Sequence, residues 1–186
     1  MNTTDRKHNA YHEAGHAVAH IRLDIYQKKA TIKLNPCISD STEAEGTNYV
    51  QNNEDANYWA LCYCAGMEEA EKRVICYCAG YAALIVLGYS DEDAMLGTDD
   101  DMENASKLIQ FWTLPGALDE WKQRSIELLS SPENILAVEA IGKALLRYET
   151  VEWEYMEQLI ELTDGHITEA EWHQFLSFRY PQKIAG

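Results

Sequence analysis

The sequence predicts a mainly α-helical fold with a small β-sheet (α+β), folded as one domain over residues 1–186. Apolar residues recur at helical spacing over most of the chain beyond residue 54, and two short segments before it alternate like strands. No linker rich in Gly, Ser or Pro divides the chain. Its 186 residues, 46% of them hydrophobic and 25% charged, are typical of a globular domain.

The first predicted helix spans residues 5–28. Thr3 and Thr4 are suitable capping residues, and no proline interrupts the segment. Gly15 costs this helix about 1 kcal/mol relative to alanine. Such a cost usually has a packing or functional reason, and the close approach of another backbone would be one. The stripe expected to face the core consists of Ala10, Ala14, Ala17, Val18, Ile21 and Ile25.

A small sheet is predicted after this helix. Residues 31–34 alternate and are stopped by Asn35–Pro36, which is typical of a short strand. Residues 46–51 form the second predicted strand, and the polar stretch 39–45 between the two is expected to be a loop.

Helices fill most of the remaining chain. Ser131 followed by Pro132 indicates an N-cap with proline at the first helical position, and Thr168 with Glu171 forms a capping box. Thr98 is the expected N-cap of a helix with an acidic first turn. The predicted helices lie near residues 54–70, 71–88, 99–113, 116–130, 133–147, 151–162 and 168–178.

Residues 74–89 carry no charge. This run is shorter than the roughly 18 apolar residues that indicate a membrane span, so we expect a buried helix and no membrane insertion, with a span as the alternative. The chain carries 31 Asp and Glu against 15 Lys and Arg, a net charge of −16, which argues against nucleic-acid binding and favours basic partners.

Five cysteines and no signal peptide indicate a reducing, cytoplasmic location. Cys-Tyr-Cys-Ala-Gly occurs twice, but residues two apart on a helix do not face each other, so neither copy can chelate a metal alone. Buried thiols are the expected interpretation for Cys37, Cys62, Cys64, Cys76 and Cys78.

The segment His12–His16 reads HEAGH, an instance of the zinc-hydrolase motif HExxH. On a helix, residues four apart lie on one face, so His12 and His16 can reach one metal ion while Glu13 serves as general base. His8 and His20 continue the spacing of four but lie too far apart along the helix to join the same ion, so a surface or supporting role is expected. The third ligand must come from a distant segment.

Four segments together resemble the zinc peptidase domain of FtsH-type ATP-dependent AAA proteases. Residues 11–18 are close to the family's AxHEAGHAV motif, residues 78–83 look like its AGRAAE helix, and residues 97–105 are similar to its GAxxDxxxA segment. Residues 140–151 look like the helix and turn near the domain's end. The resemblance covers about residues 10–162, and residues 163–186 form an unassigned C-terminal helix and tail.

The resemblance implies a zincin-type HExxH helix in a helical, bundle-like peptidase domain. It also implies that Asp101 joins His12 and His16 in holding Zn²⁺, with Glu13 catalytic. Leu84 and Tyr81 depart from the family pattern of Glu and Arg, which puts a supporting contact or an oligomer contact in doubt.

The implied function is hydrolysis of peptide bonds in unfolded or flexible polypeptides, without ATP, because no GxxxxGK[ST] loop occurs in the chain. Two alternatives remain: a non-catalytic adaptor that binds another protein through its acidic surface, and a subunit that docks on a separate ATPase. A homo-oligomer is also compatible with the sequence.

Overall fold

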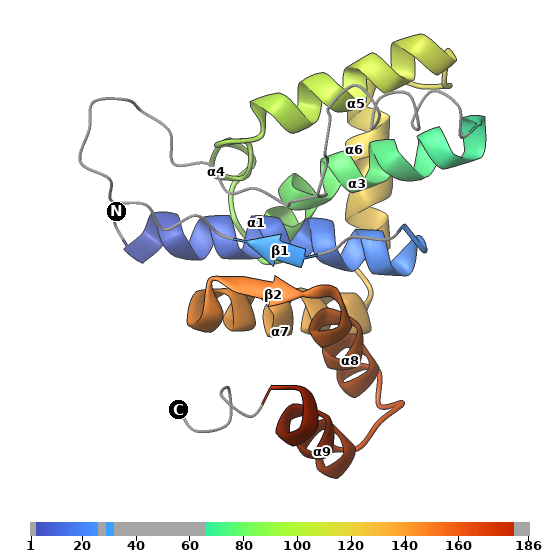
Figure 1. Ribbon diagram of the computed structural model, residues 1–186. Coiled ribbons are helices and arrows are strands. Elements are labelled where there is room, and N and C mark those ends of the chain that lie inside the picture. Colours follow the sequence, from blue (N-terminus) through green and yellow to red (C-terminus); the bar gives the residue numbers. More distant parts are fainter. Residues whose placement is uncertain (1–2, 26–28, 32–65, 181–186) are drawn as a thin grey trace.

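Helix α1 (Thr3–Arg22) lies in the middle of the molecule, between two groups of helices. In this computed structural model, which describes residues 3–25, 29–31 and 66–180, α3, α5 and α6 lie on one side of α1 and α7 and α8 on the other (Figure 1). The remaining elements are β1 (Lys29–Thr31), α3 (Met67–Val86), α4 (Asp91–Ala94), α5 (Asp99–Trp112), α6 (Leu118–Leu129), α7 (Pro132–Tyr148), β2 (Thr150–Glu152), α8 (Trp153–Thr163) and α9 (Glu169–Arg179). The prediction of a mainly helical chain is confirmed.

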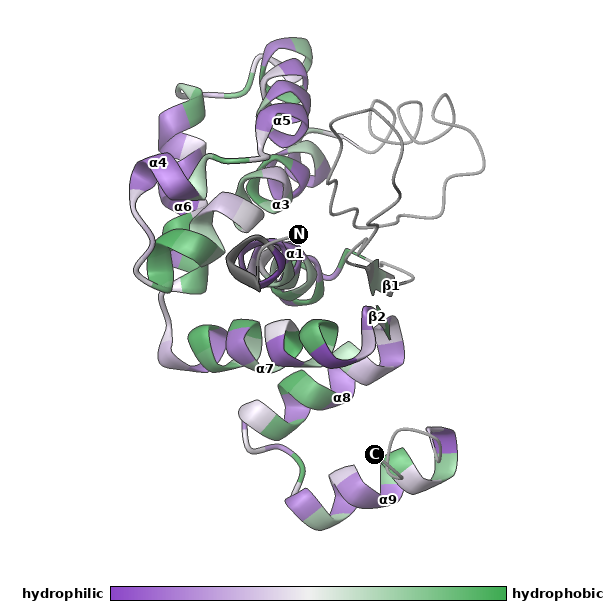
Figure 2. Cartoon of the chain, turned by 90° about the vertical axis from the view of Figure 1, so that its left-hand side faces the viewer, coloured by the Kyte–Doolittle hydropathy of each residue, from purple (hydrophilic) through white to green (hydrophobic). Residues whose placement is uncertain are grey.

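The helices enclose one apolar core, and α5, α6, α7 and α8 are the most clearly amphipathic of them. Figure 2 shows hydrophilic and hydrophobic residues alternating along the helices. The predicted stripe of α1 is buried at Ala10, Ala14, Ala17 and Val18. The largest fully buried side chains elsewhere come from α3, α5, α6, α7 and α8, and include Leu84, Leu108, Trp121, Ile141 and Met156. Among the described helices, none combines the length and the apolar character that crossing a membrane requires.

Several predicted helix ends are confirmed. The Ser131 side chain accepts the backbone N–H of Asn134, with Pro132 at the first helical position. Thr168 and Glu171 form the expected capping box of α9. Thr98 stands at the N-cap of α5, but its hydroxyl donates to the Met95 carbonyl at 2.9 Å and does not cap the helix.

The first helix ends earlier than predicted. Asp24 takes a left-handed conformation with φ 58°, and the Ile25 N–H donates to the His20 carbonyl at 2.8 Å. This is the bonding pattern of a helix C-terminus that usually contains glycine. Because aspartate also tolerates the left-handed region, the helix stops at Arg22, and not at Lys28 as predicted.

Two further boundaries differ from the prediction. The expected break between residues 70 and 71 is absent, because Glu68–Lys72 and Glu69–Arg73 ion pairs span it within one continuous α3. The short helix α4, which the sequence did not indicate, begins at Ser90, whose hydroxyl accepts the N–H of Asp93.

The strand pairing also differs from the prediction. Strand β1 pairs antiparallel with β2, which places Ala30 opposite Val151. The sequence predicts residues 151–152 as the start of helix 151–162, but buried Val151 pairs with β1 and α8 starts at Trp153. The predicted strand 46–51, residues 32–34 of the other strand, and helix residues 54–65 lie outside the described residues.

Candidate metal centre

Helices α1 and α3 pack in opposite directions at very short range. A Cβ atom on Gly15 would lie 2.3 Å from the Ala79 carbonyl oxygen and 2.5 Å from the Ala83 Cβ. The predicted close approach of a second backbone at Gly15 is therefore confirmed. This contact turns the face of α1 that carries His12 and His16 toward α3.

Helix α5 brings a carboxylate to the same place. Asp101, in the first turn of α5, places Oδ2 at 3.2 Å from His12 Nε2 and at 3.2 Å from His16 Nε2. The two Nε2 atoms lie 3.0 Å apart. Three residues separated by up to 89 positions thus meet at one point. In the described part of the chain, they are the only group of three or more His, Cys, Asp or Glu residues that could hold a metal ion.

The spacing fits a tetrahedral metal. Bonds of about 2.0–2.1 Å place the ligand atoms of a tetrahedral zinc ion roughly 3.4 Å apart, close to the triangle that these atoms form. His16 Nδ1 lies 2.7 Å from the Cys76 carbonyl oxygen, which can only accept, so Nδ1 carries the hydrogen. With a neutral ring, His16 Nε2 therefore offers a lone pair. His12 Nε2 offers one in the tautomer that carries its hydrogen on Nδ1, so both nitrogens together with the carboxylate suit a cation.

Without a metal, these groups hold a proton. Burial lowers the pKa of His16, but the charge of Asp101 and its hydrogen bond outweigh burial and leave the pKa at about 9. Burial lowers the pKa of His12, and the Asp101 hydrogen bond offsets only part of that effect. The positive His16 and the two histidine hydrogen bonds hold the pKa of Asp101 below its usual range in spite of burial. A divalent cation would displace this proton.

Glu13 is buried beside the centre, with 2% of its surface exposed. Burial raises its pKa to about 8, with the His16 charge lowering it and the Asp101 charge raising it. Without a metal ion, burial therefore favours the neutral, protonated form of this carboxyl group.

The other histidines of α1 do not join the centre. His8 is half-buried, and its Nε2 donates to the Asp93 carbonyl at 2.8 Å, which ties α1 to α4. His20 is buried, and burial lowers its pKa to about 3, with the charges of His16 and Arg73 adding to that effect. Both residues therefore have supporting positions, as the helix geometry predicted.

The cysteines of α3 also match their prediction where they are described. Cys76 and Cys78 are buried, and burial raises the pKa of both thiols, so they pack as small apolar side chains. Cys37, Cys62 and Cys64 lie outside the described residues. The sequence did not indicate the role of the Cys76 carbonyl, because any residue supplies a carbonyl group.

Tyr81 and Leu84, which depart from the FtsH-type motif, both have structural roles in α3. Tyr81 donates its hydroxyl to Asp91 at 2.6 Å, and the Lys122 ammonium lies 4.4 Å from its ring centre. Leu84 is fully buried. Tyr81 thus joins α3 to α4 and α6, while Leu84 extends the core.

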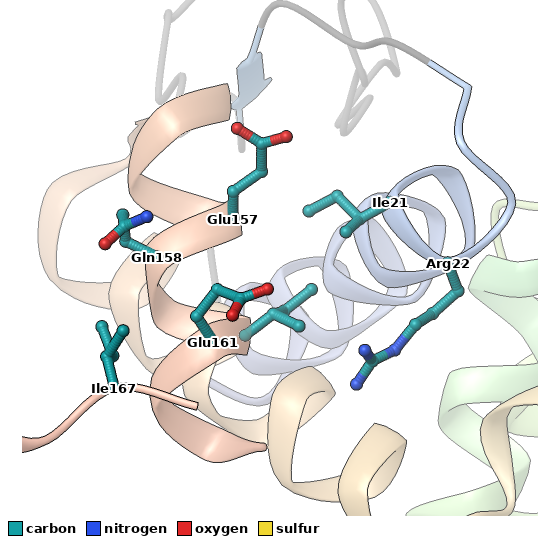
Figure 3. A pocket seen from close by; sticks show the side chains of 7 residues that line it. Ile21, Arg22, Glu157, Gln158, Glu161 and Ile167 are labelled. Carbon is teal, nitrogen blue, oxygen red and sulfur yellow. The ribbon is translucent and has the colours of Figure 1, made fainter. Parts of the chain in front are cut away.

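A pocket of about 520 Å³ lies between the end of α1 and α8, away from the candidate ligands. Figure 3 shows Ile21 and Arg22 of α1 facing Glu157 and Glu161 of α8. The Arg22 guanidinium donates to both Asp164 oxygens, at 2.6 and 2.7 Å. This ion pair joins the end of α8 to α1. None of the candidate site residues lines the pocket. The lining residues are Ile21, Arg22, Glu157, Gln158, Ile160, Glu161 and Ile167.

The site geometry is the main evidence on function. The resemblance to FtsH-type peptidases rests on the motifs in the sequence alone. Comparison of the chain with models of protein families and with curated proteins finds no match.

Proposed function

We propose that this chain is a zinc-dependent metallopeptidase that hydrolyses peptide bonds in unfolded or flexible polypeptides without ATP. The observation that carries the proposal is the meeting of His12 Nε2, His16 Nε2 and Asp101 Oδ2 within 3.2 Å of one another. The buried Glu13 beside them adds a proton acceptor. The resemblance to FtsH-type zinc peptidases supports the peptide bond as the target.

In this proposal His12, His16 and Asp101 hold the zinc ion, and three protein ligands are the number that catalytic zinc sites use. The metal, when bound, supplies Lewis acidity that polarises a carbonyl group and lowers the pKa of water. Glu13 accepts a proton from the attacking water and returns it to the leaving amine. The positive charge of a bound cation beside it would favour the ionised carboxylate that this role requires.

Asp101 is the most exposed of the three candidate ligands, which favours substrate approach from its side. Its side chain is 23% exposed, against 11% for His12 and 7% for His16. Substrate therefore approaches over the first turn of α5.

A non-catalytic adaptor, or a subunit that binds an ATPase through the acidic surface, is the competing proposal. Glu13 argues against it. A scaffold without chemistry has no need of a carboxyl group beside the candidate ligands. The enzyme proposal gives the buried Glu13 a purpose.

The test combines metal analysis with casein cleavage. We expect about one zinc ion per chain after reconstitution at neutral pH, and casein cleavage that a chelator abolishes. Glu13→Gln should keep zinc and lose cleavage by roughly 100- to 10,000-fold, because it removes the proton acceptor and no ligand. Zinc below about a tenth of an equivalent would count against the centre. A parent protein that binds zinc but cleaves nothing would favour the adaptor.

A further inference from the structure

Gly80 of α3 lies directly against the ring of His12. Resting on the metal centre proposed above, we propose that Gly80 is a positioning residue: the absence of a side chain there leaves the space in which the His12 ring lies and so directs Nε2 toward the metal. Gly80 contributes no ligand atom, so its effect acts entirely through His12.

The contact leaves no room for a side chain. A Cβ atom on Gly80 would lie 2.4 Å from His12 Cε1 and 2.6 Å from both Nδ1 and Nε2. Contacts of real Cβ atoms essentially never fall below 3.0 Å. Three consecutive ring atoms are blocked together, so a slight tilt of one ring edge cannot relieve the overlap. The ring itself would have to move.

The two histidines are held in different ways. His16 has a hydrogen bond from Nδ1 to the Cys76 carbonyl at 2.7 Å, which fixes its ring. His12 Nδ1 is buried and has no hydrogen-bond partner among the described residues. Metal-binding histidines are usually oriented by a hydrogen bond at the second nitrogen. Where His12 lacks that bond, packing against Gly80 supplies the orientation.

The positions on the two helices match. Cys76 and Gly80 are one turn apart on α3, just as His16 and His12 are one turn apart on α1. One turn of α3 therefore orients both rings. The Cys76 carbonyl holds the His16 ring by a hydrogen bond, and the space at Gly80 holds the His12 ring by packing. The resulting rings lie edge to face, with centres 4.7 Å apart.

Separation of the helices cannot easily relieve an added methyl group. Gly15 already places α1 against the backbone of α3 at Ala79, one residue from Gly80. Rotation of the His12 ring is the remaining response, and it takes Nε2 out of the triangle with His16 and Asp101. Metal affinity should therefore fall.

The matched variants are Gly80→Ala and Gly142→Ala. Gly142 of α7 also meets a ring of α1, since its Cβ would lie 2.4 Å from Tyr11 Cδ1, but that ring is not a ligand. Affinity for Zn²⁺ is measured by competition with a chromophoric chelator, and Co²⁺ is added to record the visible spectrum of the site. We expect Gly80→Ala to raise the zinc Kd by about 10- to 100-fold, as loss of an outer-shell partner does, and to alter the Co²⁺ spectrum. Gly142→Ala should keep both properties.

A His12→Ala background separates positioning from folding. Removing the imidazole empties the space beside Gly80, and alanine is the better helix former. His12→Ala/Gly80→Ala should therefore melt at the same temperature as His12→Ala or above it, even if Gly80→Ala alone fails to fold. A clear fall in melting temperature in this background would overturn the inference. An unchanged zinc Kd in a folded Gly80→Ala protein would overturn it too and would leave the proposed function intact. A parent chain that binds no zinc would overturn both.

Discussion

Three aspartates begin α5, and one of them reaches the candidate metal centre. Asp99 and Asp100 are exposed, while Asp101 places Oδ2 3.2 Å from both imidazoles. We expect Asp101→Ala to weaken zinc binding by more than about 100-fold, beyond the usual cost of losing an outer-shell group. Asp99→Ala and Asp100→Ala are the controls and should bind zinc like the parent in a chelator competition. Zinc loss from either control, with Asp101→Ala unaffected, would show that a neighbouring aspartate is the ligand.

Single residues differ in how far the sequence predicts them. His12, Glu13 and His16 could be read from spacing alone, because helix geometry fixes the relation of residues four apart. Asp101 lies 85 residues from His16, so only resemblance to a family pointed to it. The Cys76 carbonyl and the space at Gly80 exist only after α1 and α3 pack.

At the scale of helices, the α1–α3 contact depends on Gly15. Alanine is the better helix former, but its Cβ would lie 2.3 Å from the Ala79 carbonyl. We expect Gly15→Ala to lower the free energy of unfolding by about 1–3 kcal/mol, the usual cost of overpacking a core. Urea unfolding measures the change, with Lys7→Ala, an exposed position of α1, as the control. Equal or greater stability of Gly15→Ala would contradict the observed packing.

A bidentate ion pair between Arg22 and Asp164 joins α1 to the end of α8. The Arg22 hydrogen bonds lower the pKa of Asp164, although partial burial opposes them and Arg22 also faces Glu133 and Glu161. Because the folded pKa lies below the unfolded value of about 3.9, the stabilisation is complete above that value and disappears as pH falls through the folded pKa. Asp164→Asn should therefore cost about 1–3 kcal/mol at pH 7, and the difference from the parent should shrink below about pH 4.

Urea unfolding across this pH range tests that prediction. Glu154→Gln is the control, because Glu154 and its partner Arg179 are each about half exposed and their pair should contribute little. A difference between Asp164→Asn and the parent that stays constant down to pH 3 would mean that the carboxylate charge is not responsible.

The long helices were predictable, and the short elements were not. Helices such as α5 and α7 show an apolar period and capping residues in the sequence. Strand β2 has three residues, too few to reveal a period of two, and its partner β1 lies about 120 residues earlier in the chain. Glu149 before β2 has φ 64°, which ends α7 without a glycine to mark the position.

At the scale of the whole molecule, the candidate centre depends on packing between distant segments. Helix α1 carries the candidate ligands His12 and His16 and the proposed proton acceptor, α5 carries the candidate ligand Asp101, and α3 packs against both helices. The three groups meet only when these helices are assembled, so zinc binding at the proposed centre would be thermodynamically linked to folding. The C-terminal part, α8 and α9, contributes none of these groups.

The final prediction concerns energy use by the whole chain. Cleavage at the proposed centre requires only an extended segment of backbone, whereas unfolding a stable substrate requires a motor, and the sequence contains no phosphate loop to power one. We expect the purified chain to degrade casein equally well with and without ATP. A tightly folded domain with a disordered tail should lose only the tail, because stable domains are cut only through their rarely opened fraction. The Glu13→Gln protein controls for contaminating proteases. Complete degradation of the folded domain by the chain alone, or a strict ATP requirement for casein, would refute ATP-independent hydrolysis of unfolded chains.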